Sequence, residues 1–302
     1  MKLLIFILSS FLVIQAQAAV RVATYNIRNF DYDQRSNTPT NKNHLSKILK
    51  EINFDILAVQ EINKRNIFAN MIDENFGSRY QTYLSECGGA HEQHLGFVVD
   101  GSKFDVIKFE EDMRTANVNA PEHQQYSECY TGSRPLAVIK LQHKKSKIKI
   151  AAIAVHLKSG GRQNNIKKRF KQIKKIMELK SELKAIGYSQ VMIMGDFNTT
   201  EFINQTRSMK DQFQRQLVNS ELVNQTQDLS CTAYWWGQRN DNHNYPSHLD
   251  HIITSDVLRT SGAPKVYGHC KVLKCAQTHE SQMQISFDEV SDHCPISIEV
   301  DL

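Results

Sequence analysis

Polar or ionisable side chains stand at the ends of six predicted strands in this chain of 302 residues. A single Asp or Asn at such a position usually forms a turn, and a single His is more often a hydrogen-bonded structural residue. Six such positions at separate strand ends are hard to explain as turn residues alone. Strand ends are also where a rigid sheet holds ligand and catalytic groups, so we interpret these residues as candidates for such groups. They are Asn26, Glu61, His156, Asp196 with Asn198, Asp250, and Asp292 with His293.

These residue types together suit one kind of reaction. Glu61, Asn26 and Asp292 offer hard oxygen atoms, which suit Mg²⁺ or Ca²⁺ better than zinc. His156 and His293, each oriented by a carboxylate, would supply a general acid and a general base. Hydrolysis of a phosphodiester needs such a set: a cation on the phosphoryl oxygens, a base for water and a proton for the leaving oxygen.

The elements that would position these residues alternate between short strands and helices, which predicts an α/β fold with mixed sheets. The stretch VMIMGDFNTT, Val191–Thr200, shows the pattern, since a buried strand runs straight into the turn that carries Asp196 and Asn198. The predicted strands are Val20–Tyr25, Asp55–Val59, Tyr80–Leu84, Leu95–Val99, Phe104–Phe109, Pro135–Leu141, Ile148–Val155, Val191–Met194, His248–Thr254 and Ile296–Val300. The predicted helices are His44–Ile52, Ile166–Ile186 and Ile203–Val218.

The first residues have the features of an export signal. Met1 and Lys2 give a charged start, Leu3–Ile14 is apolar, and Gln15–Ala19 ends in an Ala-x-Ala pattern. A transmembrane anchor would need roughly 20 apolar residues, so we predict a signal peptide over residues 1–18, cleaved after Ala18 or Ala19. Residues 19–302 are then expected to form a single catalytic domain, secreted or periplasmic, without a stable membrane anchor.

Six cysteines follow this segment, and an even number in an exported chain predicts disulfide bonds. Six cysteines allow fifteen pairings, so the connectivity stays open. Cys270 and Cys275 enclose only four residues and could close a small loop. Zinc binding is the alternative, although the chain has no Cys-x-x-Cys pair. The six are Cys87, Cys129, Cys231, Cys270, Cys275 and Cys294.

The formal net charge of the chain is +5, which favours polyanionic partners without proving them. Much of the positive charge lies in the predicted helix Ile166–Ile186, where eight Lys and Arg residues stand against two Glu residues. This amphipathic helix either presents an ordinary solvated face or contacts phosphate groups.

Several short motifs resemble those of the endonuclease/exonuclease/phosphatase superfamily, which deoxyribonuclease I typifies. They are TYNIR, LAVQEI, SRPLAVIKL, AVHLKSG, MGDFNTT, CTAYWWG with SHLDHII, and SDHCPISIEV, and they follow the family's order over about residues 20 to 300. GDFN alone is a moderate indication, but with QE upstream and SDH-x-P near the C-terminus it is a strong one. The resemblance implies a four-layer α/β sandwich, in which two packed mixed β-sheets are flanked by helices.

The resemblance also implies a metal site and a catalytic base. Glu61 corresponds to the principal metal-binding glutamate, and Asn26 and Asp292 line the same site, where Asn26 also faces the phosphate. His293 corresponds to the histidine proposed to activate water, and Asp250 to the carboxylate that orients it.

The remaining matched positions face the leaving group and the phosphate. His156 corresponds to the second catalytic histidine, which assists the leaving group, and Glu92, in HEQHLGFVV, to the glutamate that pairs with it. Asp196 and Asn198 correspond to the pair that binds the phosphoryl group, with Asp196 as a ligand of a second cation. Arg134, in SRP, corresponds to a phosphate-contacting arginine.

The implied function is hydrolysis of DNA, with little sequence specificity, by a secreted Mg²⁺-dependent endonuclease, with Ca²⁺ or Mn²⁺ as alternative cations. His156 favours the branch of deoxyribonuclease I, neutral sphingomyelinases and inositol-phosphate phosphatases, because the exonuclease III branch usually lacks this histidine. We expect nucleic acid as the substrate and a monomeric enzyme. The sequence does not decide whether the substrate is DNA or RNA, or whether the site holds one metal ion or two.

Two other functions stay open beside this one. A sphingomyelinase-like phospholipid phosphodiesterase or a phosphatase would use the same site, and Tyr234, Trp235 and Trp236 could then dip into a membrane. The simpler interpretation is that these aromatic residues pack within a family strand. A secreted binding protein on an inactive hydrolase scaffold would have lost a catalytic residue, and all of the matched residues are present.

Three further histidines lie close to Asp250 in the sequence. His243, His248 and His251 raise the question of a metal cluster. In a loop beside Asp250, we expect them to be polar surface residues instead.

Overall fold

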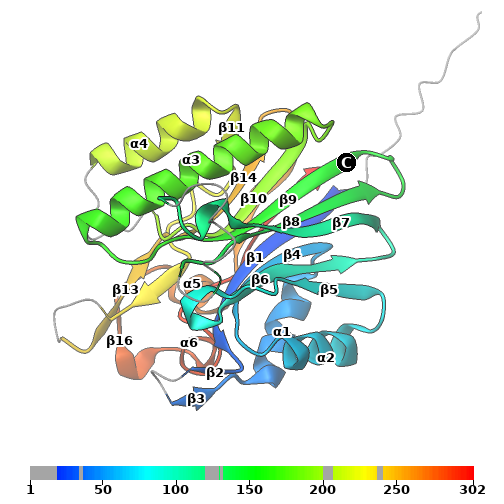
Figure 1. Cartoon of the computed structure of the whole chain (residues 1–302). Coiled ribbons are helices and arrows are strands. Elements are labelled where there is room, and N and C mark those ends of the chain that lie inside the picture. The colour runs from blue at the N-terminus through cyan, green and yellow to red at the C-terminus, as the bar shows by residue number, and fades with distance from the viewer. Residues whose placement is uncertain (1–18, 34–36, 120–128, 130–131, 200–206, 237–240) are drawn as a thin grey trace, which may run out of the picture.

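Two six-stranded β-sheets form the centre of the structure (Figure 1). The computed structural model describes residues 19–33, 37–119, 129, 132–199, 207–236 and 241–302, so the predicted signal peptide lies outside the described residues. The strand order in the first sheet is β15 (Thr260–Val266), β17 (Ile296–Asp301), β1 (Ala19–Phe30), β4 (Ile56–Ile62), β6 (His94–Asp100) and β5 (Tyr80–Leu84). The order in the second sheet is β11 (Leu222–Asn224), β14 (Asp250–Ser255), β10 (Gln190–Asp196), β9 (Lys149–His156), β8 (Leu136–His143) and β7 (Phe104–Asp112).

Each sheet has a parallel pair of strands at its centre, whereas its other neighbours are antiparallel. The parallel pairs are β1 with β4 and β9 with β10. In the first pair Asn26 lies beside Gln60, and in the second sheet Asp196 lies between His156 of β9 and Asp250 of β14. Because parallel strands end at the same edge and an antiparallel neighbour begins there, the sheet order brings the predicted strand-end residues to one edge.

The apolar core between the sheets is built from one face of each central strand. Val22, Ala58, Ala152 and Met194 belong to it and are fully buried. Alternate residues of a strand point to opposite faces, so the intervening apolar residues are free to pack against helices. The contacts between the sheets include β1 with β10 and β4 with β9, so the two parallel pairs face each other.

Helices cover the outer faces of both sheets, which confirms the predicted four-layer α/β sandwich (Figure 1). The helices α1 (Lys42–Ile52) and α2 (Arg65–Phe76) pack on the first sheet, and α3 (Gln163–Ala185) and α4 (Arg207–Val218) pack on the second. In α2, which the sequence analysis did not predict, Phe68, Met71 and Ile72 are the buried residues. No helix in the described part of the chain combines the length and the apolarity that a bilayer span needs.

The predicted strands all overlap observed ones, and the predicted helices correspond to α1, α3 and α4. Residues 203–206 of the predicted helix 203–218 lie outside the described residues. The edge strands β11 and β15 and the smaller elements beside the two sheets were not predicted, because two to seven residues without a clear apolar pattern are too few to show a periodicity. They include β12 (Ala233–Trp235), β13 (His243–Ser247), β16 (Thr278–His279), the β2 (Tyr32–Asp33) and β3 (Thr38–Pro39) pair, α5 (Gly268–Leu273) and α6 (Ile285–Asp288).

All six cysteines form disulfide bonds. The small loop proposed between Cys270 and Cys275 is wrong, because Cys270 pairs with Cys294 and Cys275 with Cys231. Cys270 lies within the short helix α5, Cys275 lies two residues beyond its end, and the two reach different neighbouring segments. The third pair is Cys87 with Cys129.

We expect Gly195→Ala at the end of β10 to be strongly destabilising. The φ of Gly195 is 137°, and an added Cβ would lie 2.1 Å from the carbonyl oxygen of Val155 in β9. Gly262→Ala is the control, since its φ is 74° but no atom lies within 4 Å of the added Cβ. Chemical denaturation should show a loss of about 1–2 kcal/mol at Gly262 and about 3 kcal/mol or more at Gly195. Equal losses would contradict the clash with Val155.

Candidate active site

An irregularity at the end of β4 turns Glu61 towards the site. The pairing of β4 with β6 changes register between Val59 and Ile62, and Glu61 has a φ of 62°. This backbone conformation costs a non-glycine residue about 1–2 kcal/mol, and such strain is frequent at functional sites. The Glu61 carboxylate accepts hydrogen bonds from Asn26 Nδ2 at 3.1 Å and from the Asn29 backbone N–H at 3.0 Å, which hold it in place.

Asp196 is the residue at which the polar ends of the two sheets meet. Its Oδ2 accepts a hydrogen bond from Asn26 Nδ2 at 3.1 Å. The same oxygen lies 3.4 Å from His156 Nε2 and 3.8 Å from His293 Nε2. His156 Nε2 is also 3.6 Å from Glu61 Oε1. Five residues from distant parts of the sequence therefore form one cluster.

His293 is held by groups on three segments. Its Nδ1 lies 2.8 Å from Asp250 Oδ2, and the backbone N–H of Asp250 donates to Thr232 Oγ1 at 2.9 Å. The backbone N–H of His293 donates to Ser291 Oγ at 3.1 Å, and the Ser291 hydroxyl donates to the Asn26 carbonyl at 2.7 Å. The sequence analysis missed both hydroxyl residues. A Ser two residues before His293 is a recognisable local turn pattern, whereas nothing in the local sequence marks Thr232.

The two predicted phosphate-binding residues Asn198 and Arg134 meet at one carbonyl group. Asn198 Nδ2 donates to the Leu157 carbonyl at 3.2 Å, and Arg134 Nη2 donates to the same oxygen at 3.3 Å. The backbone N–H of Asn198 donates to Asp196 Oδ1 at 2.7 Å. Both side chains are buried, so they are fixed beside the cluster rather than spread over the surface.

One predicted site residue does not join the cluster. The carboxylate of Glu92 is more than half exposed and lies 3.3 Å from His94 Nε2, so the structure does not make the pair with His156 that the resemblance implies. His156 Nδ1 is buried and has no hydrogen-bond partner in the described part of the chain. Asp292 is half-buried, and its negative charge helps to raise the pKa of the neighbouring His293. Its carbonyl accepts the backbone N–H of Tyr234 at 2.8 Å.

Opposite surroundings give the two site histidines opposite pKa shifts. Burial lowers the pKa of His156 well below its usual range, and the positive charge of Arg134 adds to the effect. Burial would also lower the pKa of His293, but the carboxylates of Asp250 and Asp196 outweigh it and hold that pKa well above its usual range. Burial raises the pKa of Asp196 to about 7, with His293 opposing the rise.

The donor atoms of the cluster fit a hard divalent cation. Glu61 offers a carboxylate, and Asn26 Oδ1 is buried without a hydrogen-bond partner among the described residues. Carboxylate and amide oxygens are ligands that Mg²⁺ and Ca²⁺ prefer. Glu61, Asp196 and Asp250 carry more negative charge than Arg134 alone can balance. A positive charge held there would offset the carboxylates and bring the pKa of His293 down, towards the neutral form that a general base needs.

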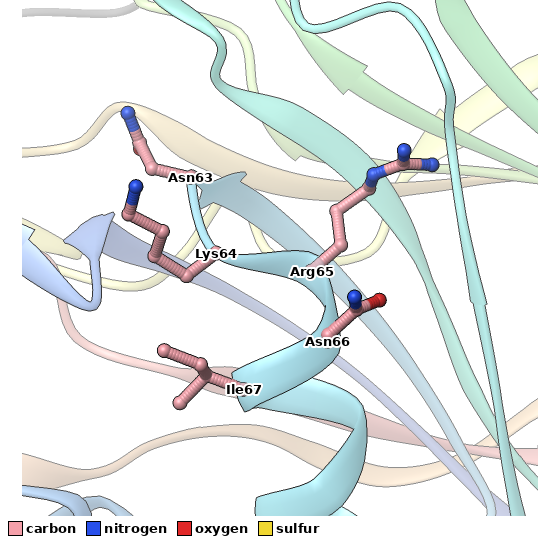
Figure 2. Close-up of a pocket in the computed structure, with 5 residues that line it drawn as sticks. All are labelled: Asn63, Lys64, Arg65, Asn66 and Ile67. Carbon is pink, nitrogen blue, oxygen red and sulfur yellow. The ribbon is translucent and has the colours of Figure 1, made fainter.

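A cavity of about 300 Å³ opens just beyond Glu61, at the N-terminus of α2 (Figure 2). Asn63 and Lys64 point to one side of it, and Arg65 points to the other. Asn63 Nδ2 donates to the His91 carbonyl at 3.1 Å. No residue of the catalytic cluster lines this cavity, which therefore belongs to the start of α2.

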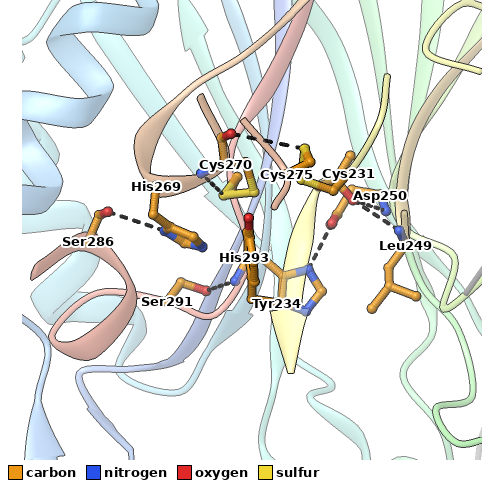
Figure 3. The surroundings of a disulfide bond; sticks show 12 residues. Cys231, Tyr234, Leu249, Asp250, His269, Cys270, Cys275, Ser286, Ser291 and His293 are labelled. Atoms are coloured by element: carbon orange, nitrogen blue, oxygen red, sulfur yellow. Dashed lines mark hydrogen bonds and ion pairs between the residues drawn. A yellow bond between two sulfur atoms is a disulfide. The ribbon is translucent and has the colours of Figure 1, made fainter. Parts of the chain in front are cut away.

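Two disulfides brace the segments that hold the His293–Asp250 pair (Figure 3). Cys294 follows His293 directly, and Cys231 precedes Thr232 directly. The backbone N–H of Cys294 donates to the Thr232 carbonyl at 2.7 Å, which ties the two disulfide-bonded segments together. The position of the imidazole therefore depends on covalent bonds as well as on hydrogen bonds.

The predicted surface position is wrong for His248 and His251, which are both buried, while His243 is half-buried. His251 lies on β14, inside the second sheet, where its neighbours exclude water. Its Nδ1 accepts a hydrogen bond from Asn224 Nδ2 at 3.0 Å, so its Nε2–H is free to donate to the Thr199 carbonyl. His251 thus supports the turn that follows Asp196, a role that only the three-dimensional contacts reveal.

A family model described as Endonuclease/Exonuclease/phosphatase family matches residues 23–293. The chain belongs to this family. No curated protein sequence matches it.

Solved structures similar to this family member share its fold. Truncated Caenorhabditis elegans TDP2 has a TM-score of 0.63 and 20% identity, with 94% of this chain and 98% of that chain covered. The Bacteroides thetaiotaomicron mannosyl-6-phosphatase has a TM-score of 0.63 and 15% identity, with coverage of 94% and 100%. Danio rerio TDP2, complexed with single-strand DNA product, has a TM-score of 0.62 and 12% identity, with coverage of 94% and 100%. At such identities the likeness establishes the fold, not the substrate.

The buried His251 should make the stability of the protein depend on pH. Burial lowers its pKa to about 4, whereas an unfolded histidine binds a proton near pH 6.5. Its contribution is therefore complete above about pH 6.5 and falls by about 1.4 kcal/mol per pH unit as the pH decreases towards 4. His251→Phe should be less stable than wild type at pH 7, and the gap in the free energy of unfolding should narrow by pH 5. A gap that stays constant, as we expect for His91→Phe at an exposed position, would contradict this account.

Removing the disulfide next to His293 should reduce activity more than stability explains. We expect Cys270→Ser/Cys294→Ser to lower kcat on a small phosphodiester by on the order of 10²-fold, because a shift of about 1 Å in a catalytic group has such an effect. Cys87→Ser/Cys129→Ser is the matched control, since each double variant should lose about 2–4 kcal/mol of stability. Both are compared well below their melting temperatures, with folding checked by circular dichroism. Equal kcat values in the two variants would rule out a special role for Cys270–Cys294.

Proposed function

We propose that the chain is an exported phosphodiesterase that depends on a divalent cation and hydrolyses DNA with little sequence preference. The observation that carries the proposal is the position of Asp196 Oδ2, at 3.4 Å from His156 Nε2 and 3.8 Å from His293 Nε2, with Glu61 3.6 Å from His156. A cation site, two imidazoles and a phosphate-facing carboxylate thus surround one point, as in-line hydrolysis of a phosphodiester requires.

In this proposal the residues of the cluster divide the reaction between them. A divalent cation held by Glu61 and Asn26 would polarise the phosphoryl group and offset its negative charge. His293 Nε2, oriented through Nδ1 by Asp250, takes the proton from the attacking water. His156 Nε2 protonates the leaving oxygen. Burial favours its neutral form, but a bound phosphodiester brings the negative charge that favours its protonated form.

The phosphate would be held by Arg134 and Asn198, whose donor groups lie next to Asp196 around the Leu157 carbonyl. Contacts of this kind go to the backbone of a nucleic acid and carry no sequence information. The net charge of +5 and the DNA product named for Danio rerio TDP2 also support a nucleic-acid substrate.

The second candidate function is hydrolysis of another phosphate ester at the same site. The similar mannosyl-6-phosphatase supports a phosphatase. For a phospholipid, the relevant feature is Trp236, which is 68% exposed, whereas Tyr234 is packed in β12 and donates its hydroxyl hydrogen to the Ala276 carbonyl. A single exposed Trp provides less membrane contact than the three consecutive aromatics suggested.

The experiment that tests the proposal is a substrate panel with and without EDTA. We expect purified mature protein to cut plasmid and linear duplex DNA in Mg²⁺ and to lose this activity in EDTA. His156→Ala and His293→Ala should each lower kcat on the order of 10²-fold or more. Single-stranded DNA, RNA, sphingomyelin, inositol phosphates and sugar phosphates complete the panel. Faster turnover of a lipid or a phosphomonoester than of DNA would replace the proposed substrate, and full activity in EDTA would exclude the cation.

A further inference from the structure

The loop after His156 and the first half of α3 carry a one-sided charge. Between residues 157 and 177 the chain has eight Lys and Arg residues and no Asp or Glu. The positive residues are Lys158, Arg162, Lys167, Lys168, Arg169, Lys171, Lys174 and Lys175. Such a run is usually a solvated face, so its meaning depends on where the structure places it.

The structure joins this segment directly to the active site. Arg169 is buried, and its Nη1 donates to the Lys158 carbonyl at 2.9 Å and to the Gly160 carbonyl at 2.7 Å. Gln172 Oε1 accepts the backbone N–H of Lys158 at 2.9 Å. The first turns of α3 are thereby fastened to the loop that follows His156 directly, so the basic segment starts two residues from this member of the cluster.

Lys158 interacts electrostatically with the arginine of the cluster and with the cations of α3. Burial lowers the pKa of Lys158, and the positive charges of Arg134, Lys168 and Arg169 lower it further. Lys158 therefore lies within electrostatic range of a phosphate-site arginine on one side and of α3 on the other. Neighbouring cations that repel one another in this way gain free energy when a polyanion binds.

The outward face of α3 has a suitable spacing for a phosphate backbone. Lys167, Lys171 and Lys174 are exposed and recur at intervals of four and three residues, so they share one face of the helix. At 1.5 Å per residue they span about 10 Å, the rise of roughly three nucleotides of one strand at 3.4 Å each. Within the described residues no ion pair engages Lys167 or Lys174.

The second half of α3 lacks this excess of positive charge. Lys184 forms an ion pair with Glu221 at 2.6 Å, and Glu182 forms one with Arg114 at 2.8 Å. Lys180 is buried and donates to the Ser220 carbonyl at 2.7 Å. The excess of positive charge thus lies at the catalytic end of the helix and not along its whole length.

We propose that Lys167, Lys171 and Lys174, with Lys158 and Arg162 between them and the cluster, bind the phosphate backbone of a nucleic-acid substrate outside the catalytic centre. The inference rests on the proposed function for its choice of polyanion. It adds that a long strand is bound over α3, several nucleotides from the bond that is cut.

The test compares two triple variants that lose the same charge. Lys167→Gln/Lys171→Gln/Lys174→Gln removes the α3 face, and Lys108→Gln/Lys145→Gln/Lys265→Gln removes three exposed lysines outside α3. Binding of a fluorescent DNA duplex, with 30 nucleotides in each strand, is measured by anisotropy in EDTA over a series of salt concentrations. In Mg²⁺, kcat and KM are measured on long duplex DNA and on bis(4-nitrophenyl) phosphate, which is too small to reach α3.

We expect the α3 variant to bind the duplex more weakly, with the slope of log affinity against log salt reduced by up to about 0.9 for each lysine removed. Its KM for long DNA should rise, whereas hydrolysis of the small diester should stay at the wild-type rate. The control variant should show a smaller change in both quantities. Equal affinities and salt slopes for the two variants would overturn the inference.

A different result would overturn the proposed function. If the wild-type protein hydrolyses the small diester but no nucleic acid, DNA is not its substrate. The anisotropy in EDTA still decides whether α3 binds a polyanion, because it does not depend on cleavage. Binding of vesicles containing anionic lipid in preference to duplex DNA, lost in the α3 variant, would assign the surface to a membrane and reject the nucleic acid.

Discussion

The face-to-face packing of the two sheets is the constraint on which the active site depends. The parallel pairs β1–β4 and β9–β10 lie opposite each other across an apolar core, and both pairs end at the same edge. Asn26 and Glu61 arrive from one sheet and His156 and Asp196 from the other. The polar side chains of the two sheets approach to about 3–4 Å, and the thickness of the core sets this distance. A change in the packing of the core would therefore displace the side chains of the cluster.

Local patterns in the sequence predicted the parts of this arrangement that depend on neighbouring residues. Apolar and β-branched runs located ten of the strands, although not β15. The polar residues that follow these runs indicated that Glu61, His156 and Asp196 lie at strand ends. The four-layer arrangement came from the order of the family motifs. Helix α2 escaped prediction because only Phe68, Met71 and Ile72 form its buried stripe, which is too short a pattern to stand out from the surrounding polar residues.

The features that could not be predicted depend on contacts between distant segments. The disulfide partners Cys231 and Cys275 are 44 residues apart, and nothing in their surroundings distinguishes this pairing from the rejected loop. The burial of His251 likewise follows from its place on β14 beside β10, since the same His in a loop would be solvated. For Glu92, the short sequence match implied a pair with His156, but the carboxylate lies beside His94 instead. A match of a few residues does not specify the direction of a side chain.

The catalytic cluster and a nucleic-acid substrate both carry negative charge, so binding calls for two sources of positive charge: a cation within the cluster and a basic surface outside it. The buried cluster is rich in carboxylates, which hold the pKa of His293 well above its usual range, whereas burial is the main cause that raises the pKa of Asp196 to about 7. A polyanion approaching such a centre is repelled at short range, where low dielectric strengthens the interaction. A cation at Glu61 would offset the negative potential within the cluster, but salt would screen its effect beyond about 10 Å. Attraction at longer range must come from an extended set of exposed charges, and among the described elements the first half of α3 is a basic surface fastened to the loop beyond His156. In the proposed function, chemistry and capture of the substrate are therefore separated in space: we assign the first to carboxylates and imidazoles at the sheet edge, and the second to lysines on a helix fastened to the loop that leaves the same edge.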